Sequence, residues 1–348
     1  MTISEIKLLC RQCNIVPNKS HGQNFLIDEN IVKKIIEAAE IEKDEIILEV
    51  GPGLGILTSE LVKCAGRVVA VELDKNIFGF LQAEFFLDPS LALPLNKGEG
   101  RRAVRPPPCF KEGVRGWSKI KIPPPFRHPS LKQGGGKTYY ALKQGEGKTV
   151  KNLEIIQGDI LKLNPGDFGL KDFKYKVVAN LPYSITSFFL RRFLEQAPRP
   201  SEMILMVQKE VAERVVAQPG KMSVLSVAAQ FFSQPKILFK VSRSCFWPEP
   251  EVDSAVISLK LAKKLPFDDS KEFFRIVKIG FSSRRKQLQN NLAAGLKVKN
   301  EEIKEILRGL GFDQKVRAQE LRVEDWVKLV EKIQNIKIFS SSRGSERE

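Results

Sequence analysis

Two hydrophobic patterns alternate in the first quarter of the chain. Continuous apolar runs at Glu45–Val50 and Arg67–Leu73 are typical of buried strands. Each run is followed by a segment with apolar residues at helical spacing, at Ile56–Cys64 and Lys75–Phe86. The first strand ends in glycines, so we expect it to run into a tight turn before the next helix.

The same alternation returns after residue 150. Apolar runs predict strands at Leu153–Gln157, Tyr175–Asn180 and Met203–Val207, with helices between these three strands. Near the N-terminus, Asp28 has the position of an N-cap for a helix that carries Ile31, Ile35 and Ala38 on one side. Strands that alternate with helices predict an α/β fold with a parallel, doubly wound sheet.

From about residue 264 the pattern becomes helical. We expect helices at Lys271–Phe281, Arg284–Ala294, Glu301–Arg308 and Val323–Ile336. The predicted organisation is therefore an α/β domain over residues 1–262, a small helical domain over 263–338 and a disordered tail over 339–348.

Residues 88–149 interrupt the α/β pattern. They contain 9 of the 20 prolines and an internal repeat, with Leu131–Thr138 recurring as Leu142–Thr149. We predict a disordered, low-complexity insert. It connects the end of a helix to the start of a strand, on the rim opposite the ligand-binding carboxyl ends of a parallel sheet. Deleting residues 90–148 should therefore preserve activity.

The charge of the chain indicates a class of binding partner. The net charge of +16 favours a polyanionic partner. Residues 88–149 hold 13 Lys/Arg and 4 Asp/Glu, so more than half of that charge lies in the insert. The basic character of the rest of the chain is moderate, and a nucleic-acid partner needs support from motifs.

Cysteine spacing and hydropathy argue against a zinc protein and a membrane-spanning protein. Only Cys10 and Cys13 have metal-ligand spacing, and no second pair completes a zinc site, so we expect free thiols and no metal. No apolar run approaches the roughly 18 residues that a membrane span requires. The N-terminus lacks the pattern of a signal peptide, and we expect a cytoplasmic, monomeric protein that does not bind a membrane.

A glycine-rich turn is the first candidate for chemistry. Gly51, Gly53 and Gly55 follow a predicted strand and precede a helix, where the backbone can approach a ligand closely. Glu72 ends the next strand, 21 residues after Gly51, where a carboxylate can accept hydrogen bonds from ribose hydroxyls. Asp159 follows the third strand, where it can reach the adenosine end of a cofactor.

Two cofactors fit this turn. A dinucleotide fingerprint requires a glycine at its sixth position, where this chain has Ile56. S-adenosylmethionine has no pyrophosphate and needs only room for its methionine part. The turn therefore favours S-adenosylmethionine over NAD, and a purely structural glycine turn is the remaining alternative.

Asn180-Leu181-Pro182-Tyr183 follows the fourth strand and is the candidate acceptor motif. An amide oxygen and a backbone carbonyl can accept the two N–H bonds of the adenine amino group and hold its nitrogen in line with the methyl donor. Pro182 fixes the backbone, and Tyr183 can stack on the base. Positioning is the main requirement. On its own the motif is also compatible with a simple Asn-Pro turn.

Together these motifs resemble the KsgA/RsmA family of ribosomal RNA adenine dimethyltransferases. Residues 15–87 and 150–330 carry the resemblance. Besides the motifs above, it rests on four strings, Lys19–Leu26, Gln208–Arg214, Phe246–Val256 and Phe281–Lys286 continuing to Asn290–Leu292. The resemblance implies a Rossmann-like methyltransferase domain followed by a small helical domain that binds rRNA.

The resemblance also implies roles for individual residues. The expected S-adenosylmethionine contacts are Asn24, Leu26, Gly51, Glu72, Asp159 and Asn180. Asn180 and Tyr183 would grip the target adenine, and Phe246 would stack on its other face. The implied substrate is a pair of adjacent adenosines in the 3′-terminal hairpin of small-subunit rRNA. In the approach to Phe246 the chain departs from the family's Val-Pro-Pro, because Val241 is followed by Ser242 and Arg243.

Arg284, Arg285 and Lys286 form the candidate RNA-binding cluster. Cations at the start of a helix oppose its dipole, which favours a phosphate contact over a plain solvated face. Competing interpretations are a methyltransferase of large-subunit rRNA, a ribosome-assembly factor that keeps the fold without turnover, and an NAD oxidoreductase.

Overall fold

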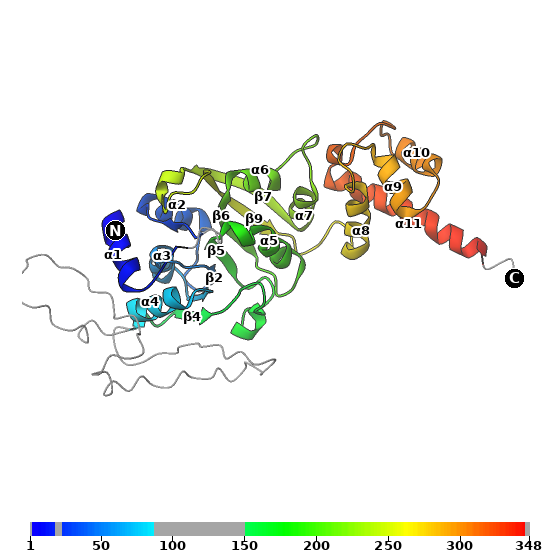
Figure 1. Cartoon of the computed structure of the whole chain (residues 1–348). Coiled ribbons are helices and arrows are strands. Elements are labelled where there is room, and N and C mark those ends of the chain that lie inside the picture. Colours follow the sequence, from blue (N-terminus) through cyan, green and yellow to red (C-terminus); the bar gives the residue numbers. More distant parts are fainter. Residues whose placement is uncertain (1, 18–22, 87–149, 345–348) are drawn as a thin grey trace, which may run out of the picture. The chain divides into compact units, whose positions relative to one another are not determined.

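The computed structural model describes residues 2–17, 23–86 and 150–344, the last nine of these as backbone only. A seven-stranded sheet is its main feature, with strand order β4-β3-β2-β5-β6-β9-β7 (Figure 1). The strands β4, β3, β2, β5 and β6 pair in parallel along that order. The order of the strands along the chain reverses direction at β2, which lies between β3 and β5. The expected doubly wound α/β fold is confirmed.

The five parallel strands lie close to their predicted positions. Their bounds are Ile46–Val50 for β2, Arg67–Glu72 for β3, Leu153–Gln157 for β4, Lys176–Asn180 for β5 and Glu202–Gln208 for β6. The two helices α3 (Ile56–Cys64) and α4 (Lys75–Phe86) match their predicted ranges. Between β4 and β5 the predicted helix is wrong. A short 3-10 turn at Pro165–Phe168, capped by Asn164, takes its place.

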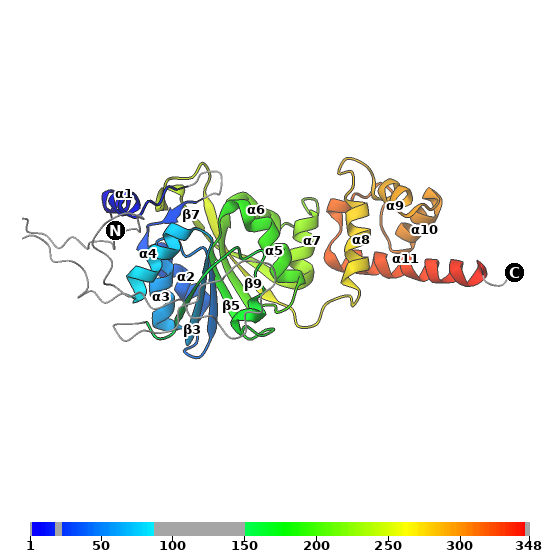
Figure 2. The same ribbon diagram turned by 60° about the horizontal axis from the view of Figure 1, so that its bottom comes forward.

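Apolar burial on both faces of the sheet explains the continuous hydrophobic runs. On one face, Ile47, Val68 and Ala70 share a core with side chains of α2 (Glu29–Ala39), α3 and α4, which lie together in Figure 2. On the other face Leu48, Val69 and their neighbours are also fully buried. Strands buried on both faces need no polar alternation, so their signal is an unbroken apolar run.

Local capping fixes the helices that precede the sheet. Asp28 accepts hydrogen bonds from the N–H groups of Asn30 and Ile31, as its position predicts for the start of α2. A further helix, α1 (Ile3–Gln12), begins with a capping box between Thr2 and Glu5. It packs Ile6 and Cys10 into the same core. The sequence patterns above did not predict α1.

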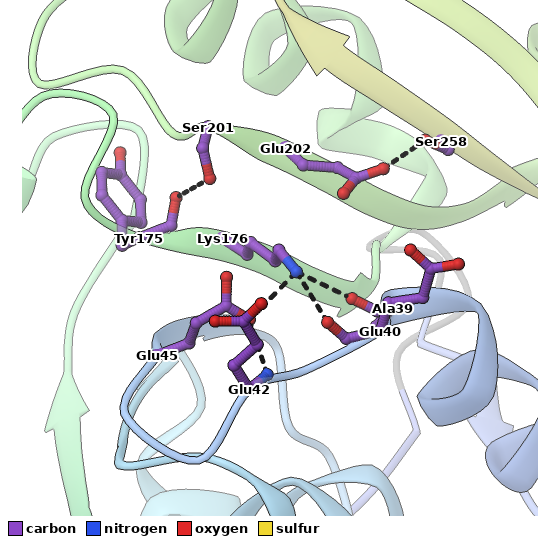
Figure 3. A network of polar contacts seen from close by, with 9 residues as sticks. All are labelled: Ala39, Glu40, Glu42, Glu45, Tyr175, Lys176, Ser201, Glu202 and Ser258. Atoms are coloured by element: carbon purple, nitrogen blue, oxygen red, sulfur yellow. Dashed lines mark hydrogen bonds and ion pairs between the residues drawn. The ribbon is translucent and has the colours of Figure 1, made fainter.

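A partly buried lysine ties the end of α2 to the sheet. The ammonium of Lys176, at the start of β5, donates to the carbonyls of Ala39 and Glu40 at 3.1 and 2.9 Å (Figure 3). It also lies 3.0 Å from the carboxylate of Glu45, just before β2. The C-terminal carbonyls of a helix carry partial negative charge and lack helical partners, so the cation satisfies them and fixes this corner.

The second compact unit comprises residues 210–237 and 259–348, and the first comprises 1–209 and 238–258. The boundary passes through β7 (Ser233–Val241) and β9 (Ser254–Leu261), two strands that the hydrophobic pattern did not reveal. Neither did it reveal α6 (Lys209–Val215) and α7 (Val224–Phe232). The two units differ from the expected domains at 1–262 and 263–338, and that division stays a prediction.

Helices build the second unit around aromatic side chains. Phe231 of α7 stacks on Phe273 at 4.4 Å between ring centroids, and Phe274 lies edge-on to Phe231 at 5.2 Å. Trp326 is fully buried against Gly280 and Leu288. Besides α6 and α7, the helices of this unit are α8 (Ser270–Gly280), α9 (Leu288–Leu296), α10 (Asn300–Gly309) and α11 (Val323–Gly344).

One of these helices corrects a prediction. The helix expected at Arg284–Ala294 begins only at Leu288, with Gln287 as its N-cap. Arg284, Arg285 and Lys286 are exposed in the preceding turn. Buried Asn291 stabilises this turn by donating to the carbonyls of Gly280 and Ser283. Because the cations lie outside the first helical turn, the helix dipole gives no support for a phosphate contact.

Two predictions fall on residues outside the described part of the chain. The predicted insert at 88–149 lies wholly there, and so do residues 345–348 of the predicted tail at 339–348. The described flanks show that the insert connects the end of α4 to the start of β4. That connection is of the expected helix-to-strand kind. None of the described helices is both long and apolar enough to cross a membrane.

Candidate active site

A pocket lies where four parallel strands end. Gly51 follows β2, Glu72 ends β3, Asp159 follows β4 and Asn180 ends β5, and all four line the pocket. This is the carboxyl edge at which open α/β sheets bind ligands, beside the point where the strand order reverses. The other predicted residues along its wall are Asn24, Leu26, Gly53, Leu181, Pro182 and Tyr183.

The glycine turn has the conformation that its sequence requires. Gly51, Gly53 and Gly55 have φ angles of +66°, +57° and +79°, in the left-handed region that other residues adopt at a cost. A Cβ on Gly51 would lie 3.5 Å from the Cδ atom of Pro182. The turn therefore packs directly against the acceptor motif, which places the two predicted motifs in one site.

Glu72 is buried and bonded to the turn. Its carboxylate accepts hydrogen bonds from the N–H of Asp74 at 2.8 Å and the N–H of Gly53 at 3.4 Å. Burial raises the pKa of Glu72 from 4.5 to about 7, against the lowering effect of these two bonds. A ligand that donates hydrogen bonds to this carboxylate would favour its charged form.

Glu49 is a second buried carboxyl, to which the sequence motifs assign no role. Its Oε2 atom accepts a hydrogen bond from the hydroxyl of Thr58 at 2.7 Å. Its Oε1 atom has no hydrogen-bond partner in the described part of the chain. Burial, with a smaller contribution from the charge of nearby Glu72, raises the pKa of Glu49 to about 8. Close to neutral pH this carboxyl is therefore mostly protonated.

Residues from the N-terminal segment complete the wall of the pocket. Strand β1 (Phe25–Leu26) pairs antiparallel with β8 (Phe246–Trp247), and Leu26 lies opposite Phe246. The amide nitrogen of Asn180 donates to the carbonyl of Asn24 at 3.3 Å. This bond directs the nitrogen of the Asn180 amide toward the segment and leaves its oxygen for another partner.

Tyr183 is oriented by a residue far away in the sequence. Its hydroxyl lies 2.7 Å from the hydroxyl of Ser254, at the start of β9. Burial raises the pKa of Tyr183 above 10, so the phenol stays protonated. Sequence reasoning missed this contact, because 71 residues separate the two side chains. Ser254 lies inside one of the strings that carry the family resemblance, which was the only available signal.

The backbone of the acceptor motif distinguishes its two central carbonyls. The Pro182 carbonyl already accepts hydrogen bonds from the N–H of Ile185 at 3.2 Å and the hydroxyl of Thr186 at 3.3 Å. The N–H of Leu181 donates to the carbonyl of Met206 at 3.2 Å, which anchors the motif to β6. The Leu181 carbonyl is thus the better placed of the two to accept a hydrogen bond from a ligand.

Some of the predicted site residues do not line the pocket. Phe246 is only 3% exposed, packs in the core and is not among the residues that line the pocket. Asp159 lines the pocket and pairs with Lys162 at 3.3 Å. The basic cluster Arg284, Arg285 and Lys286 belongs to the other unit. The roles of Phe246 and of the basic cluster therefore stay predictions.

The unusual approach to Phe246 is held by hydrogen bonds. Ser242 caps a short 3-10 turn, Arg243–Cys245, by accepting from the N–H of Ser244. Asp253 accepts from the N–H of Arg243 at 3.1 Å. The carbonyl of Cys245 accepts from the N–H of Ile27 at 2.9 Å. These bonds occupy the segment in which the resembled family has two prolines.

Comparison with protein families identifies relatives of nearly the whole chain. The family model described as "Ribosomal RNA adenine dimethylase" matches residues 16–97 and 140–335. The Ribosomal RNA small subunit methyltransferase A of Dehalococcoides mccartyi (strain CBDB1) is 34% identical over 329 residues, which cover 94% of this chain and 92% of the relative. Its namesake from Moorella thermoacetica is 35% identical over 339 residues, 94% of this chain and 96% of the relative.

Solved structures show the same fold. A dimethyladenosine transferase from Plasmodium falciparum superposes with a TM-score of 0.61 at 22% identity, over 89% of this chain and 98% of that one. The 23S rRNA methyltransferase ErmE gives a TM-score of 0.60 at 22% identity, over 89% of this chain and all of that one.

Proposed function

Because this chain belongs to the ribosomal RNA adenine dimethylase family, we propose that it methylates N6 of two adjacent adenosines in the 3′-terminal hairpin of small-subunit rRNA. The methyl donor is S-adenosylmethionine and the product is N6,N6-dimethyladenosine. The observation that carries the proposal is the shared pocket, in which the glycine turn lies against the acceptor motif so closely that a Cβ on Gly51 would be 3.5 Å from Pro182. The reaction contributes to small-subunit assembly in the cytoplasm.

The described residues fit the donor. When bound, S-adenosylmethionine supplies an electrophilic methyl group on its sulfonium. Two of the three glycines with positive φ, Gly51 and Gly53, line the pocket, where the backbone of the turn can approach the donor closely. Glu72 lies in the same pocket at the end of β3, where its carboxylate can accept both ribose hydroxyls. Asn24, Leu26 and Asp159 line the same pocket and complete the set of proposed contacts.

The acceptor motif fits an adenine amino group. The Asn180 oxygen and the Leu181 carbonyl accept its two N–H bonds, since the Asn180 nitrogen already faces Asn24 and the Pro182 carbonyl is occupied. The Tyr183 ring, oriented through Ser254, stacks on the base. Phe246 would reach the other face only after a local opening of its buried position.

Positioning is the main catalytic contribution of this chain. The amino nitrogen loses a proton only as the new N–C bond forms, so no general base is required before attack. Tyr183 stays protonated because burial raises its pKa, which makes it a stacking group and not a base. Holding two reactants in line can contribute about 7–11 kcal/mol to the reduction of a barrier.

Methyl transfer to isolated ribosomal subunits tests the proposal. The protein is incubated with labelled S-adenosylmethionine and undermethylated small or large subunits, and the RNA is digested to nucleosides. We expect label in N6,N6-dimethyladenosine from small subunits alone. Asn180→Ala should lower kcat by at least about 100-fold through loss of alignment, while Asn300→Ala, an exposed position on α10, should not.

The other outcomes separate the alternatives. Label in large-subunit RNA would favour the substrate named for ErmE, the structure with the same fold. Binding to small subunits without transfer to any RNA would favour an assembly factor that has no turnover. Either result would contradict the proposed reaction.

A further inference from the structure

Two exposed apolar side chains flank the acceptor motif. Phe188 is 68% exposed, five positions after Tyr183 on helix α5 (Thr186–Glu195). Val252 is 45% exposed, two positions before Ser254. The hydroxyls of Tyr183 and Ser254 are 2.7 Å apart. This hydrogen bond joins the two segments that carry Phe188 and Val252. They belong to the same compact unit as the pocket.

The fold does not use the ring of Phe188. Helix α5 buries Phe189 and Phe193, whose rings stack on each other at 4.3 Å. Phe188 lies on the opposite, solvent-facing side, together with exposed Ser184 one turn before it and exposed Arg191 one turn after it. Isolated apolar side chains are common on protein surfaces. The significance of Phe188 lies in its position, since Ser184 also lines the pocket.

We propose that Phe188 is the platform on which the nucleobase next to the target adenosine stacks. This inference rests on the proposed function. Swinging an adenine out of its stack leaves the adjacent base without a neighbour, at a cost of a few kcal/mol. An exposed aromatic face can replace the lost stacking, and it accepts any base. The partner surface is therefore a splayed single strand of RNA.

Charge on α5 agrees with this partner. Arg191 is exposed one turn beyond Phe188, and its ion pair with Glu195 at 3.5 Å is long and solvent-accessible. Such a pair contributes little to stability, so the guanidinium can turn to a phosphate of the same strand. A substrate with two adjacent adenosines would place one in the pocket and the other on Phe188.

Substitutions at Phe188 test this role in the full-length protein. Phe188→Ala should lower kcat/KM for undermethylated small subunits about 5- to 150-fold, the range measured for loss of one aromatic–base stack. The loss should appear in KM, with the Kd of S-adenosylmethionine and the urea midpoint unchanged because the ring is exposed. Phe188→Trp should retain activity, and Phe188→Leu should lose much of it. Leu8→Ala, which removes another exposed apolar side chain, from α1, is the control.

A fluorescent base gives a direct measurement. In an RNA hairpin with 2-aminopurine beside the target, stacking on Phe188 should quench the probe with the wild type and much less with Phe188→Ala. If the wild type is active and Phe188→Ala leaves both kcat/KM and the quenching unchanged, the inference about Phe188 is overturned while the proposed function stands. A loss on whole subunits but not on the hairpin would also overturn it, because the partner would then be a ribosomal protein. A wild type that transfers no methyl group would instead contradict the proposed function.

Discussion

The buried carboxyl of Glu49 should make stability depend on pH in a predictable direction. One of its oxygens is bonded to Thr58, and the other has no hydrogen-bond partner in the described residues. Burial raises its pKa from 4.5 to about 8. Glu49→Gln keeps the size and the bond to Thr58 but removes the titratable proton.

The direction and size of the pH effect on the free energy of unfolding follow from these pKa values. Between pH 4.5 and about 8 the folded protein keeps a proton that the unfolded chain has released, so the free energy of unfolding falls as pH rises. At about 1.36 kcal/mol per pH unit, raising the pH from about 5 to about 8 destabilises the wild type by up to about 4 kcal/mol through this group. The glutamine variant lacks this loss. Its extra buried N–H costs about 1–3 kcal/mol at any pH.

The variant should therefore be less stable than the wild type at pH 5 and more stable at pH 8. Urea unfolding followed by circular dichroism at several pH values measures the difference. Glu154→Gln is the matched control, because it also changes a buried strand carboxylate but breaks its 2.7 Å ion pair with Arg67. The control should be less stable at both pH values. The reasoning is refuted if the difference between Glu49→Gln and wild type is the same at pH 5 and pH 8.

Four further predictions concern the rest of the molecule. Burial raises the pKa of Glu72 to about 7 and ribose hydroxyls favour the carboxylate, so calorimetry should find tighter S-adenosylmethionine binding as pH rises from 6 to 8; in Glu72→Gln this dependence should disappear. Lys176→Met should lower the free energy of unfolding by about 2 kcal/mol or more, because three oxygens lose their cation. Gly280→Ala should destabilise the helical unit by about 1–3 kcal/mol in thermal unfolding, since its Cβ would lie 2.4 Å from the Trp326 ring. If Arg284 contacts phosphate, Arg284→Glu should weaken RNA binding and reduce the slope of log Kd against log salt by about one; an unchanged slope would reject that contact.

Local patterns in the sequence predicted the five parallel strands of the sheet. Strands such as β2 and β3 are buried on both faces, so an unbroken apolar run identifies them without knowledge of their neighbours. The glycine turn was equally readable, because only glycine readily adopts its three positive φ angles. Gly51, Glu72, Asp159 and Asn180 each stand at the end of a predicted parallel strand, and they do lie at one edge of the sheet.

Helices and strands with a weak hydrophobic pattern were harder to predict from the sequence. The exposed positions of β7 break its apolar run, and α9 begins four residues later than its apolar spacing predicts. In the turn before α9, the buried amide of Asn291 holds the carbonyl of Ser283, which a helix starting at residue 284 would have used itself. Such ends depend on side chains that compete with the backbone, which periodicity does not report.

Residue types and their spacing predicted the kind of site, whereas folding sets the orientation of its side chains. Whether the Asn180 oxygen or nitrogen faces the pocket depends on the carbonyl of Asn24, 156 residues away. The direction of the Tyr183 ring depends on Ser254, and the burial of Phe246 depends on its pairing with Leu26. These are contacts between distant segments, and their distances exist only once the chain has folded. Local spacing in a sequence carries no information about them.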